Sequence, residues 1–179
     1  MTAETNEVVL STRDLRAVTA FAAACAETAL RTFEADRPDD TRPREAIAAA
    51  WEFARGGKRG KPLRDTAAAA LKAARATDTA AGREAAWAAM SAAAAAYLHP
   101  LAKPTQVKHI LGAAAHAARA AELAAGDDRS VAAGHLERAL RRATPAVVDV
   151  LGRFPRAPDG GGRVGELTRT LDTALRTPG

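Results

Sequence analysis

The sequence predicts an all-α protein, a single-domain bundle of about eight helices that includes an antiparallel pair of long helices. Hydrophobic residues make up 47% of the 179 residues, but aromatic residues make up only 4%. Alanine supplies most of the hydrophobic fraction, and alanine is the best helix former. Apolar residues recur every three or four positions, as one face of a helix requires. The one β-like run, residues 8–10, is too short to predict a sheet.

The N-terminal part predicts a short tail and two helices. Residues 1–10 form the tail, and Ser11 then caps the first helix within a capping-box pattern. An apolar stripe at helical spacing continues to Phe33. Pro43 begins the second helix, which runs to about Ala54, because proline suits the first turn of a helix but not its interior.

Three further helices are each bounded by proline, glycine or a capping residue. The third begins at Pro62, a turn at 77–79 caps the fourth, and Pro100 ends it. The fifth begins after Pro104, and the short connection predicts that the fourth and fifth pair antiparallel. Gly112 within the fifth helix costs about 1 kcal/mol against alanine, so we expect it to allow a close helix crossing. The predicted inner stripe of the fourth helix is Trp87, Met90, Ala94, Tyr97 and Leu98.

The C-terminal third predicts two more helices, a hinge and a last helix. A turn at 126–128 precedes the sixth helix, and Thr144–Pro145 begins the seventh. These helices complete the helical bundle domain, residues 11–152. Residues 153–179 form a Gly/Pro hinge and a C-terminal helix that packs on the bundle.

Charge and cysteine content limit the partners and the compartment. The net charge is +5 and the pI is near 10.0, which permits an acidic protein partner or a phosphate backbone. Abundant arginine and alanine are typical of a GC-rich coding genome, which weakens the charge as evidence for nucleic acid. Cys25 is the only cysteine, residues 1–10 lack a secretory pattern, and the alanine runs are unlike a membrane span. We expect a cytoplasmic protein without membrane contact.

No catalytic, metal or cofactor motif stands out. His109 and His116 share a helix face but lie about 10 Å apart, which is too far for one metal ion with ligands at about 2 Å. The run from Gly56 to Lys61 lacks the spacing and the hydroxyl residue of a phosphate loop. No serine or cysteine lies in a nucleophile motif. The sequence therefore favours binding over catalysis, with no metal and no cofactor.

Two charged loops flank the second helix and are the candidate partner-binding segments. In the first loop we expect the acids to cap the helix and to pair with Arg42 and Arg44, with partner contact as the alternative. The second loop is rich in glycine and carries the densest positive charge in the chain. The candidate contact residues are Asp39, Asp40, Arg42, Arg44, Arg55, Lys58 and Arg59.

The few large side chains offer a second kind of site. Core packing is the first expectation for them, because they must fill the space that alanines leave. The alternative is an aromatic pocket between helices that binds a small molecule. Its candidate residues are Trp51, Trp87, Tyr97 and His109.

Two stretches carry a family resemblance. They are Asp14-Leu15-Arg16 through Arg37-Pro38-Asp39-Asp40-Thr41-Arg42-Pro43 to Trp51-Glu52-Phe53-Ala54-Arg55-Gly56, and Val107-Lys108-His109-Ile110-Leu111-Gly112. Both resemble the Imm-5-like immunity proteins of bacteria, and the similarity covers most of residues 11–125. The resemblance implies an all-helical domain that neutralises a toxin by binding it. The chain departs from the family pattern in its basic glycine loop, where an acidic, aliphatic segment is usual, and at His116, where tyrosine is usual.

Three hypotheses about function follow. The leading one is an immunity-type protein that binds a cognate protein toxin through the charged loops. The second is a protein that binds a toxic small molecule or antibiotic for self-resistance, or an unusual enzyme, with the aromatic pocket as its site. The third and least favoured is nucleic-acid binding through the arginines. No feature of the sequence indicates an oligomeric state.

Overall fold

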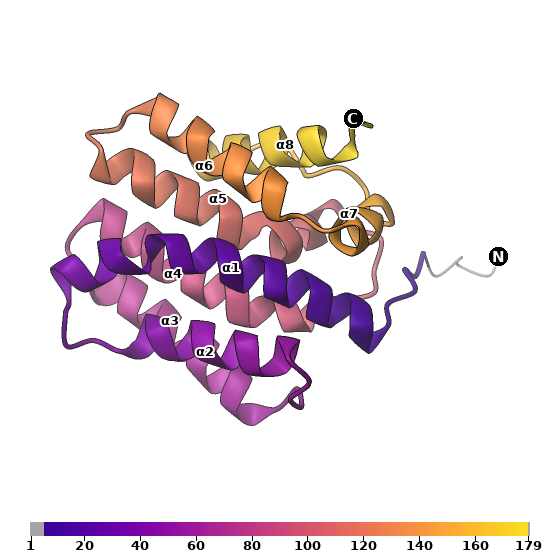
Figure 1. Ribbon diagram of the computed structural model, residues 1–179, viewed down its shortest axis with the longest axis horizontal. Coiled ribbons are helices and arrows are strands. Elements are labelled where there is room, and N and C mark those ends of the chain that lie inside the picture. The colour runs from indigo at the N-terminus through magenta and orange to yellow at the C-terminus, as the bar shows by residue number, and fades with distance from the viewer. Residues whose placement is uncertain (1–5, 179) are drawn as a thin grey trace.

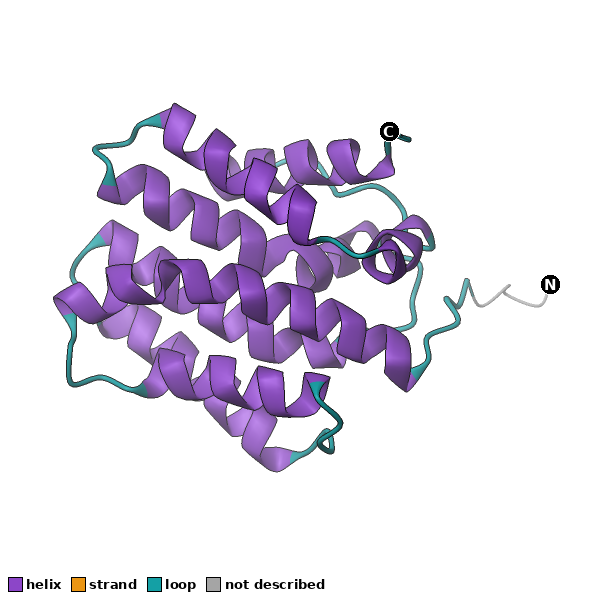
Figure 2. Ribbon diagram, in the orientation of Figure 1, coloured by secondary structure: helices purple, strands orange, loops and turns teal. Residues whose placement is uncertain are grey.

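The computed structural model describes residues 6–178, which form eight α-helices with mostly short connections (Figures 1 and 2). The helices are α1 Thr12–Asp36, α2 Arg42–Ala54, α3 Lys61–Ala76, α4 Ala80–Ala94, α5 Val107–Ala124, α6 Arg129–Arg142, α7 Pro145–Gly152 and α8 Gly162–Arg176. Within these residues, β pairing is limited to an isolated antiparallel bridge between Glu7 and Leu101. The predicted all-α single domain is confirmed. None of the described helices is long and apolar enough to cross a membrane.

Capping residues and prolines set most helix starts where the sequence predicts them. The amide of Asp14 donates to Oγ of Ser11 at 3.1 Å, and the amide of Ser11 donates to Oδ2 of Asp14 at 2.9 Å. Thr79 and Thr144 cap α4 and α7 by accepting an amide hydrogen from the first turn. Because the first amides of a helix lack partners within it, these caps fix where each helix begins.

Helix α1 crosses the middle of the bundle and packs against α2, α4, α5 and α7 (Figure 1). Helices α4 and α5 pair antiparallel, as predicted. Glu84 near the start of α4 contacts His116 in the second half of α5, while Ser91 further along α4 faces Gly112. Alanine forms most of the buried surface of these two helices, so their backbones pack closely.

The predicted inner stripe of α4 is wrong for most of its members. The α-helix ends at Ala94, a 3-10 turn continues to Tyr97, and Trp87, Met90 and Tyr97 are only half-buried. The buried face of α4 consists of small residues, namely Gly82, Ala85, Ala86, Ala88, Ala89, Ser91, Ala92 and Ala93. Because the neighbouring helices approach α4 over these residues, the large side chains lie at the edge of the bundle.

Gly112 faces α4, but the crossing does not depend on glycine there. A Cβ atom added at Gly112 would have Oγ of Ser91 as its nearest neighbour, at 3.6 Å. That is an ordinary contact distance, so a methyl group fits. The expectation that Gly112 provides a close approach is therefore wrong.

The predicted N-terminal tail is bound to the bundle from residue 6 onward, while residues 1–5 lie outside the described part of the chain. Val8 is buried, and its amide donates to the carbonyl of Pro100 at 3.0 Å. Arg153 donates to the carbonyl of Val9 at 2.7 Å. The end of the tail is thereby fixed to two distant segments.

The predicted hinge is also fixed, and α8 packs on α5, α6 and α7. Asp172 of α8 is buried and accepts hydrogen bonds from the amide of Ala157 at 2.9 Å and from Nε of Arg176 at 2.6 Å. Arg176 also donates to the carbonyl of Phe154 at 3.0 Å. These bonds satisfy the loop backbone, so the segment is an ordered connection.

Candidate partner-binding surface

The two predicted contact loops lie at opposite ends of α2. This helix has 13 residues, so its ends are about 20 Å apart at 1.5 Å per residue. In Figure 1 the α1–α2 loop lies on the left and the α2–α3 loop lies on the right. The loops are therefore two separate candidate surfaces, and they differ in how their charges are paired.

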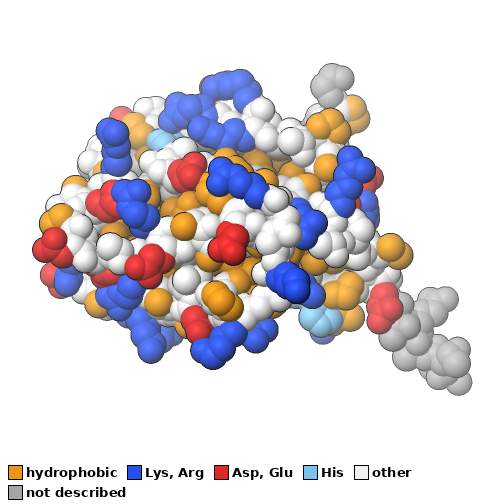
Figure 3. Space-filling model, turned by 60° about the horizontal axis from the view of Figure 1, so that its bottom comes forward, with side chains coloured by type: hydrophobic (Ala, Val, Ile, Leu, Met, Phe, Trp, Pro, Cys, Tyr) orange, Lys and Arg blue, Asp and Glu red, His pale blue; other side chains and the backbone are white. Residues whose placement is uncertain are grey.

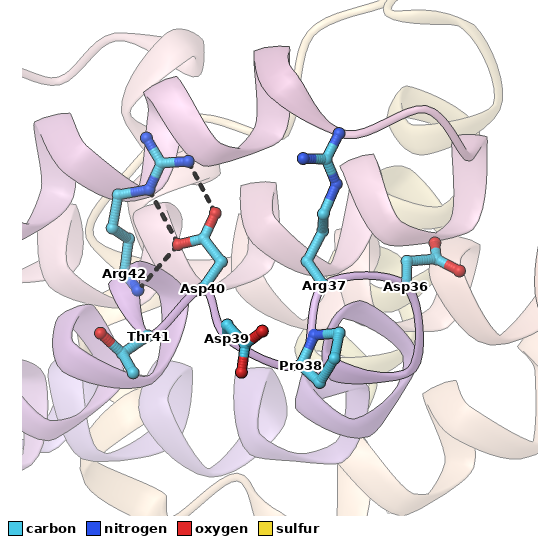
Figure 4. A pocket seen from close by; sticks show the side chains of 7 residues that line it. All are labelled: Asp36, Arg37, Pro38, Asp39, Asp40, Thr41 and Arg42. Atoms are coloured by element: carbon cyan, nitrogen blue, oxygen red, sulfur yellow. Dashed lines mark hydrogen bonds and ion pairs between the residues drawn. The ribbon is translucent and has the colours of Figure 1, made fainter.

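Most charges in the α1–α2 loop are paired within the protein. Nε of Arg42 donates to Oδ1 of Asp40 at 2.8 Å, and Nη2 of Arg42 donates to Oδ2 at 2.6 Å (Figure 4). These hydrogen bonds hold the pKa of Asp40 below its ordinary value, because they stabilise the carboxylate. Arg44 donates instead to Glu34 of α1, with Nε 2.8 Å from Oε1. The predicted local pairing is confirmed for Arg42 and is wrong for Arg44.

The same loop is tied to the turn between α3 and α4. Asp36 accepts a hydrogen bond from the hydroxyl of Thr79, and Arg37 lies 3.3 Å from the carboxylate of Asp78. Asp39 is exposed and forms no ion pair within residues 6–178. The hollow drawn in Figure 4, about 550 Å³, is lined by the loop itself. With most of its charges compensated, this loop offers a partner little net charge.

The α2–α3 loop and its neighbours carry positive charge that lacks acidic partners. Lys61 at the start of α3 pairs with Asp65, but the other cations here form no ion pair within the described part of the chain. Figure 3 brings forward the lower side of Figure 1, which carries α2 and α3, and basic side chains are spread over it. We use the name basic surface for the five cations around the α2–α3 loop that form no ion pair within residues 6–178, namely Arg16, Arg55, Lys58, Arg59 and Arg64.

Aromatic rings hold the arginines of the basic surface in place. The guanidinium carbon of Arg59 lies 5.3 Å from the ring centre of Tyr97, and Arg59 also donates to a backbone carbonyl at 3.0 Å. Arg64 lies 5.8 Å from the same ring, and Arg55 lies 4.9 Å from the ring of Trp51. Each such contact stabilises by about 0.5–1 kcal/mol at an exposed site. These contacts therefore favour the observed positions of the guanidinium groups before any partner binds.

The structure divides the predicted pocket residues into two groups. Trp51 and Tyr97 support the basic surface and do not share a cavity with Trp87 and His109. Nε1 of Trp51 donates to Glu27 at 2.6 Å, and the hydroxyl of Tyr97 donates to the backbone of the α2–α3 loop at 3.0 Å. Both polar ends are thus satisfied within the protein.

Trp87 and His109 line a groove of about 230 Å³ over α4 and α5. The ring of Trp87 stacks on that of His116 with centroids 5.6 Å apart, and Nδ1 of His116 lies 2.6 Å from the carboxylate of Glu84. Burial lowers the pKa of His109, which favours the neutral imidazole. A second hollow of about 260 Å³ adjoins the groove along α8 and shares Lys108 and His116 with it.

Sequence reasoning missed Arg16 and His116 as site residues. The spacing of His109 and His116 places both on one face of α5, and this spacing is the sequence signal that could have placed His116 beside His109 in the groove. Within residues 6–178, no three His, Cys, Asp or Glu side chains are grouped so that they could hold a metal ion. Arg16 is forty positions from the loop carbonyl that it contacts, and no local pattern indicates that contact.

These features define an all-helical domain with a cationic surface whose charges lack acidic partners among residues 6–178. The family model described as Imm-5 like putative immunity protein matches residues 9–143, roughly three quarters of the chain. The chain belongs to this family, which confirms the resemblance seen in its sequence. The match includes the basic surface and ends before α7. Comparisons with curated proteins and with solved structures gave no match.

Proposed function

We propose that this protein neutralises a protein toxin by binding it through the basic surface. Membership of an immunity family supports the role. The contrast between the two ends of α2 supports the location. One end pairs its arginines with Asp40 and Glu34, whereas the other leaves Arg55, Lys58 and Arg59 without acidic partners in the described part of the chain.

An acidic surface on the toxin would supply the missing counter-charges. Opposite potentials accelerate encounter and discriminate against wrong partners. Arginines already ordered on Trp51 and Tyr97 lose less conformational freedom on binding, which favours affinity. Salt screens exposed charges, so the association rate should fall as ionic strength rises.

Co-expression with candidate toxins from the same genome, starting with the products of any neighbouring genes, tests this proposal. Wild-type protein should restore growth, and Arg59→Glu should not, because the reversed charge repels an acidic surface. Arg141→Glu is the matched control, since Arg141 is exposed on α6, which packs on neither α2 nor α3. Arg141→Glu changes the net charge by the same amount as Arg59→Glu, but at a position away from the basic surface. Full protection by a folded Arg59→Glu variant would overturn the proposed location.

The groove over α4 and α5 favours a second candidate function, the binding of a small planar molecule. The stacked Trp87 and His116 rings present an aromatic face there, and His109 offers a neutral imidazole. Trp51→Phe would leave Trp87 as the only tryptophan, so its fluorescence would report on this groove. A ligand should change that signal, and His116→Ala should weaken the response. An unchanged signal across a broad metabolite panel would remove this candidate.

A further inference from the structure

A hollow of about 380 Å³ lies between the start of α1 and the α2–α3 loop. Its charged lining is entirely positive, with Arg16 from α1 and Lys58 and Arg59 from the loop. The remaining lining residues are Thr12, Leu15, Phe53 and Gly57. Like charges around one hollow repel each other, and an anion inside it would relieve that repulsion.

Arg16 has hydrogen-bonding capacity that this chain does not use. Its Nη2 donates to the carbonyls of Gly56 at 3.0 Å and Gly57 at 3.3 Å, and its guanidinium carbon lies 5.7 Å from the ring centre of Phe53. Its Nε–H group is buried and has no acceptor among residues 6–178. A buried donor without a partner costs about 1–3 kcal/mol, and few such groups occur in folded proteins. The unpaired donor leaves the guanidinium group of Arg16 incompletely hydrogen-bonded beside the hollow.

The two glycines explain how the loop backbone comes to hold Arg16. A Cβ atom on Gly57 would lie 2.8 Å from the carbonyl oxygen of Glu52, so a side chain is excluded there. Gly56 has a φ angle of 118°, which residues with a side chain rarely adopt. The glycine pair therefore lets the loop turn tightly with both carbonyls on Arg16. This fixes the guanidinium group at the hollow.

We infer that the hollow is a carboxylate-binding pocket that receives an aspartate or glutamate side chain of the partner protein. A guanidinium group presents N–H donors whose planar geometry matches the two oxygens of a carboxylate. Lys58 and Arg59 supply further positive charge at the rim. The inference rests on the proposed function, because the toxin supplies the side chain, and it adds the chemistry of one contact within the basic surface.

Titration with a blocked glutamate, N-acetylglutamate amide, tests the pocket in the full-length protein. NMR of the ¹⁵N-labelled chain follows the arginine Nε–H signals, and Arg16→Lys identifies the signal of Arg16. That signal should shift to saturation, whereas the signal of Arg44, which is paired with Glu34, should stay in place. Lys58→Gln should weaken binding about threefold or more, because it removes a charge from the rim. Arg141→Gln, on α6, should leave it unchanged.

Two results of the titration would overturn the inference. A shift at Arg16 that does not saturate, and that is no larger than at exposed arginines, would show that there is no pocket. Tighter binding of inorganic phosphate than of the blocked glutamate would show that the site selects phosphate and not a carboxylate. The melting temperature of each variant shows whether it is folded. If Arg16→Lys does not fold, the weaker glutamate binding expected of Lys58→Gln still tests the pocket.

The growth assay separates this inference from the proposed function. Loss of protection by Arg59→Glu without any glutamate binding at Arg16 would support the basic surface and overturn the pocket. If blocked glutamate binds at Arg16 but the Arg16→Lys variant still protects fully, the pocket does not contact the toxin, and the inference is overturned. Loss of both glutamate binding and protection in Arg16→Lys would support the inference.

Discussion

Arg163 forms a bidentate ion pair with the buried carboxylate of Glu122 and thereby links α8 to α5. Nε of Arg163 donates to Oε1 of Glu122 at 2.9 Å, and Nη2 donates to Oε2 at 2.6 Å. Glu122 is fully buried and also accepts a hydrogen bond from Arg119. Because α8 lies beyond the residues that match the family, this pair joins the C-terminal helix to the family domain.

Arg163→Ala should therefore destabilise the protein by about 1.5–3 kcal/mol, because it removes charged hydrogen bonds to the buried carboxylate of Glu122, which keeps Arg119 as a partner. Urea unfolding, followed by circular dichroism, measures the change. Arg129→Ala is the matched control, because Arg129 is exposed and lies 3.4 Å from Glu166 in a surface pair. Its effect should stay within about 1 kcal/mol. Equal effects of the two variants would contradict the role given to Arg163.

The same pair should make stability depend on pH. Hydrogen bonds from Arg163 hold the pKa of Glu122 below its ordinary value of 4.5. The unfolded chain then binds a proton more readily than the folded chain, so the contribution is complete above pH 4.5 and is lost as the pH falls further. Glu122→Gln should lower stability most near neutral pH, and its difference from wild type should narrow in acid.

Urea unfolding at about pH 7 and about pH 3 measures that difference. Glu137→Gln is the control, since Glu137 is exposed on α6 and forms no ion pair within residues 6–178. Its difference from wild type should be small at both pH values. If the loss of stability caused by Glu122→Gln were larger at about pH 3 than at about pH 7, the pKa of Glu122 would not be lowered by folding.

The fold was predictable from the sequence because its helix boundaries depend on local chemistry. Ser11, Thr144 and the prolines act within one turn of their own positions, so their pattern is visible without a structure. The buried face of α4 was not predictable in the same way. Alanine occurs on every side of that helix, and an apolar stripe drawn through Trp87 and Met90 selects the edge of the bundle.

The site was predictable only in part. The density of positive charge between Arg55 and Arg64 is visible in the sequence, and all of those cations except Lys61 lack acidic partners within the described residues. The contact of Arg16 with the loop joins segments forty residues apart, and the pairing of Arg44 with Glu34 depends on how α1 and α2 pack. Such contacts follow from tertiary structure, and no local pattern encodes them.

The helix glycines should respond to alanine in opposite directions. Gly112→Ala should stabilise the protein by about 0.5–1 kcal/mol, because a methyl group fits beside Ser91 and alanine favours the helix. Gly82→Ala should destabilise it, because the added Cβ would lie 2.7 Å from Oδ2 of Asp36 and 2.8 Å from Oγ1 of Thr79. Thermal unfolding of both variants measures the two signs. Stabilisation by both would mean that the α1–α4 contact at Gly82 is looser than the structure shows.

Cys25 should be unreactive in the native protein and should react only through unfolding. It is buried among alanines of α1, and burial raises the pKa of its thiol to about 12, so almost no thiolate is present at neutral pH. Native protein mixed with a thiol reagent should therefore label slowly, and protein in concentrated urea should label at once. A Cys25→Ala, Arg31→Cys variant is the control, because Arg31 is exposed on the same helix and a cysteine there should label in the native state. Rapid labelling of native Cys25 would show that α1 opens locally, and α1 would then not be the rigid centre on which α2, α4 and α5 pack.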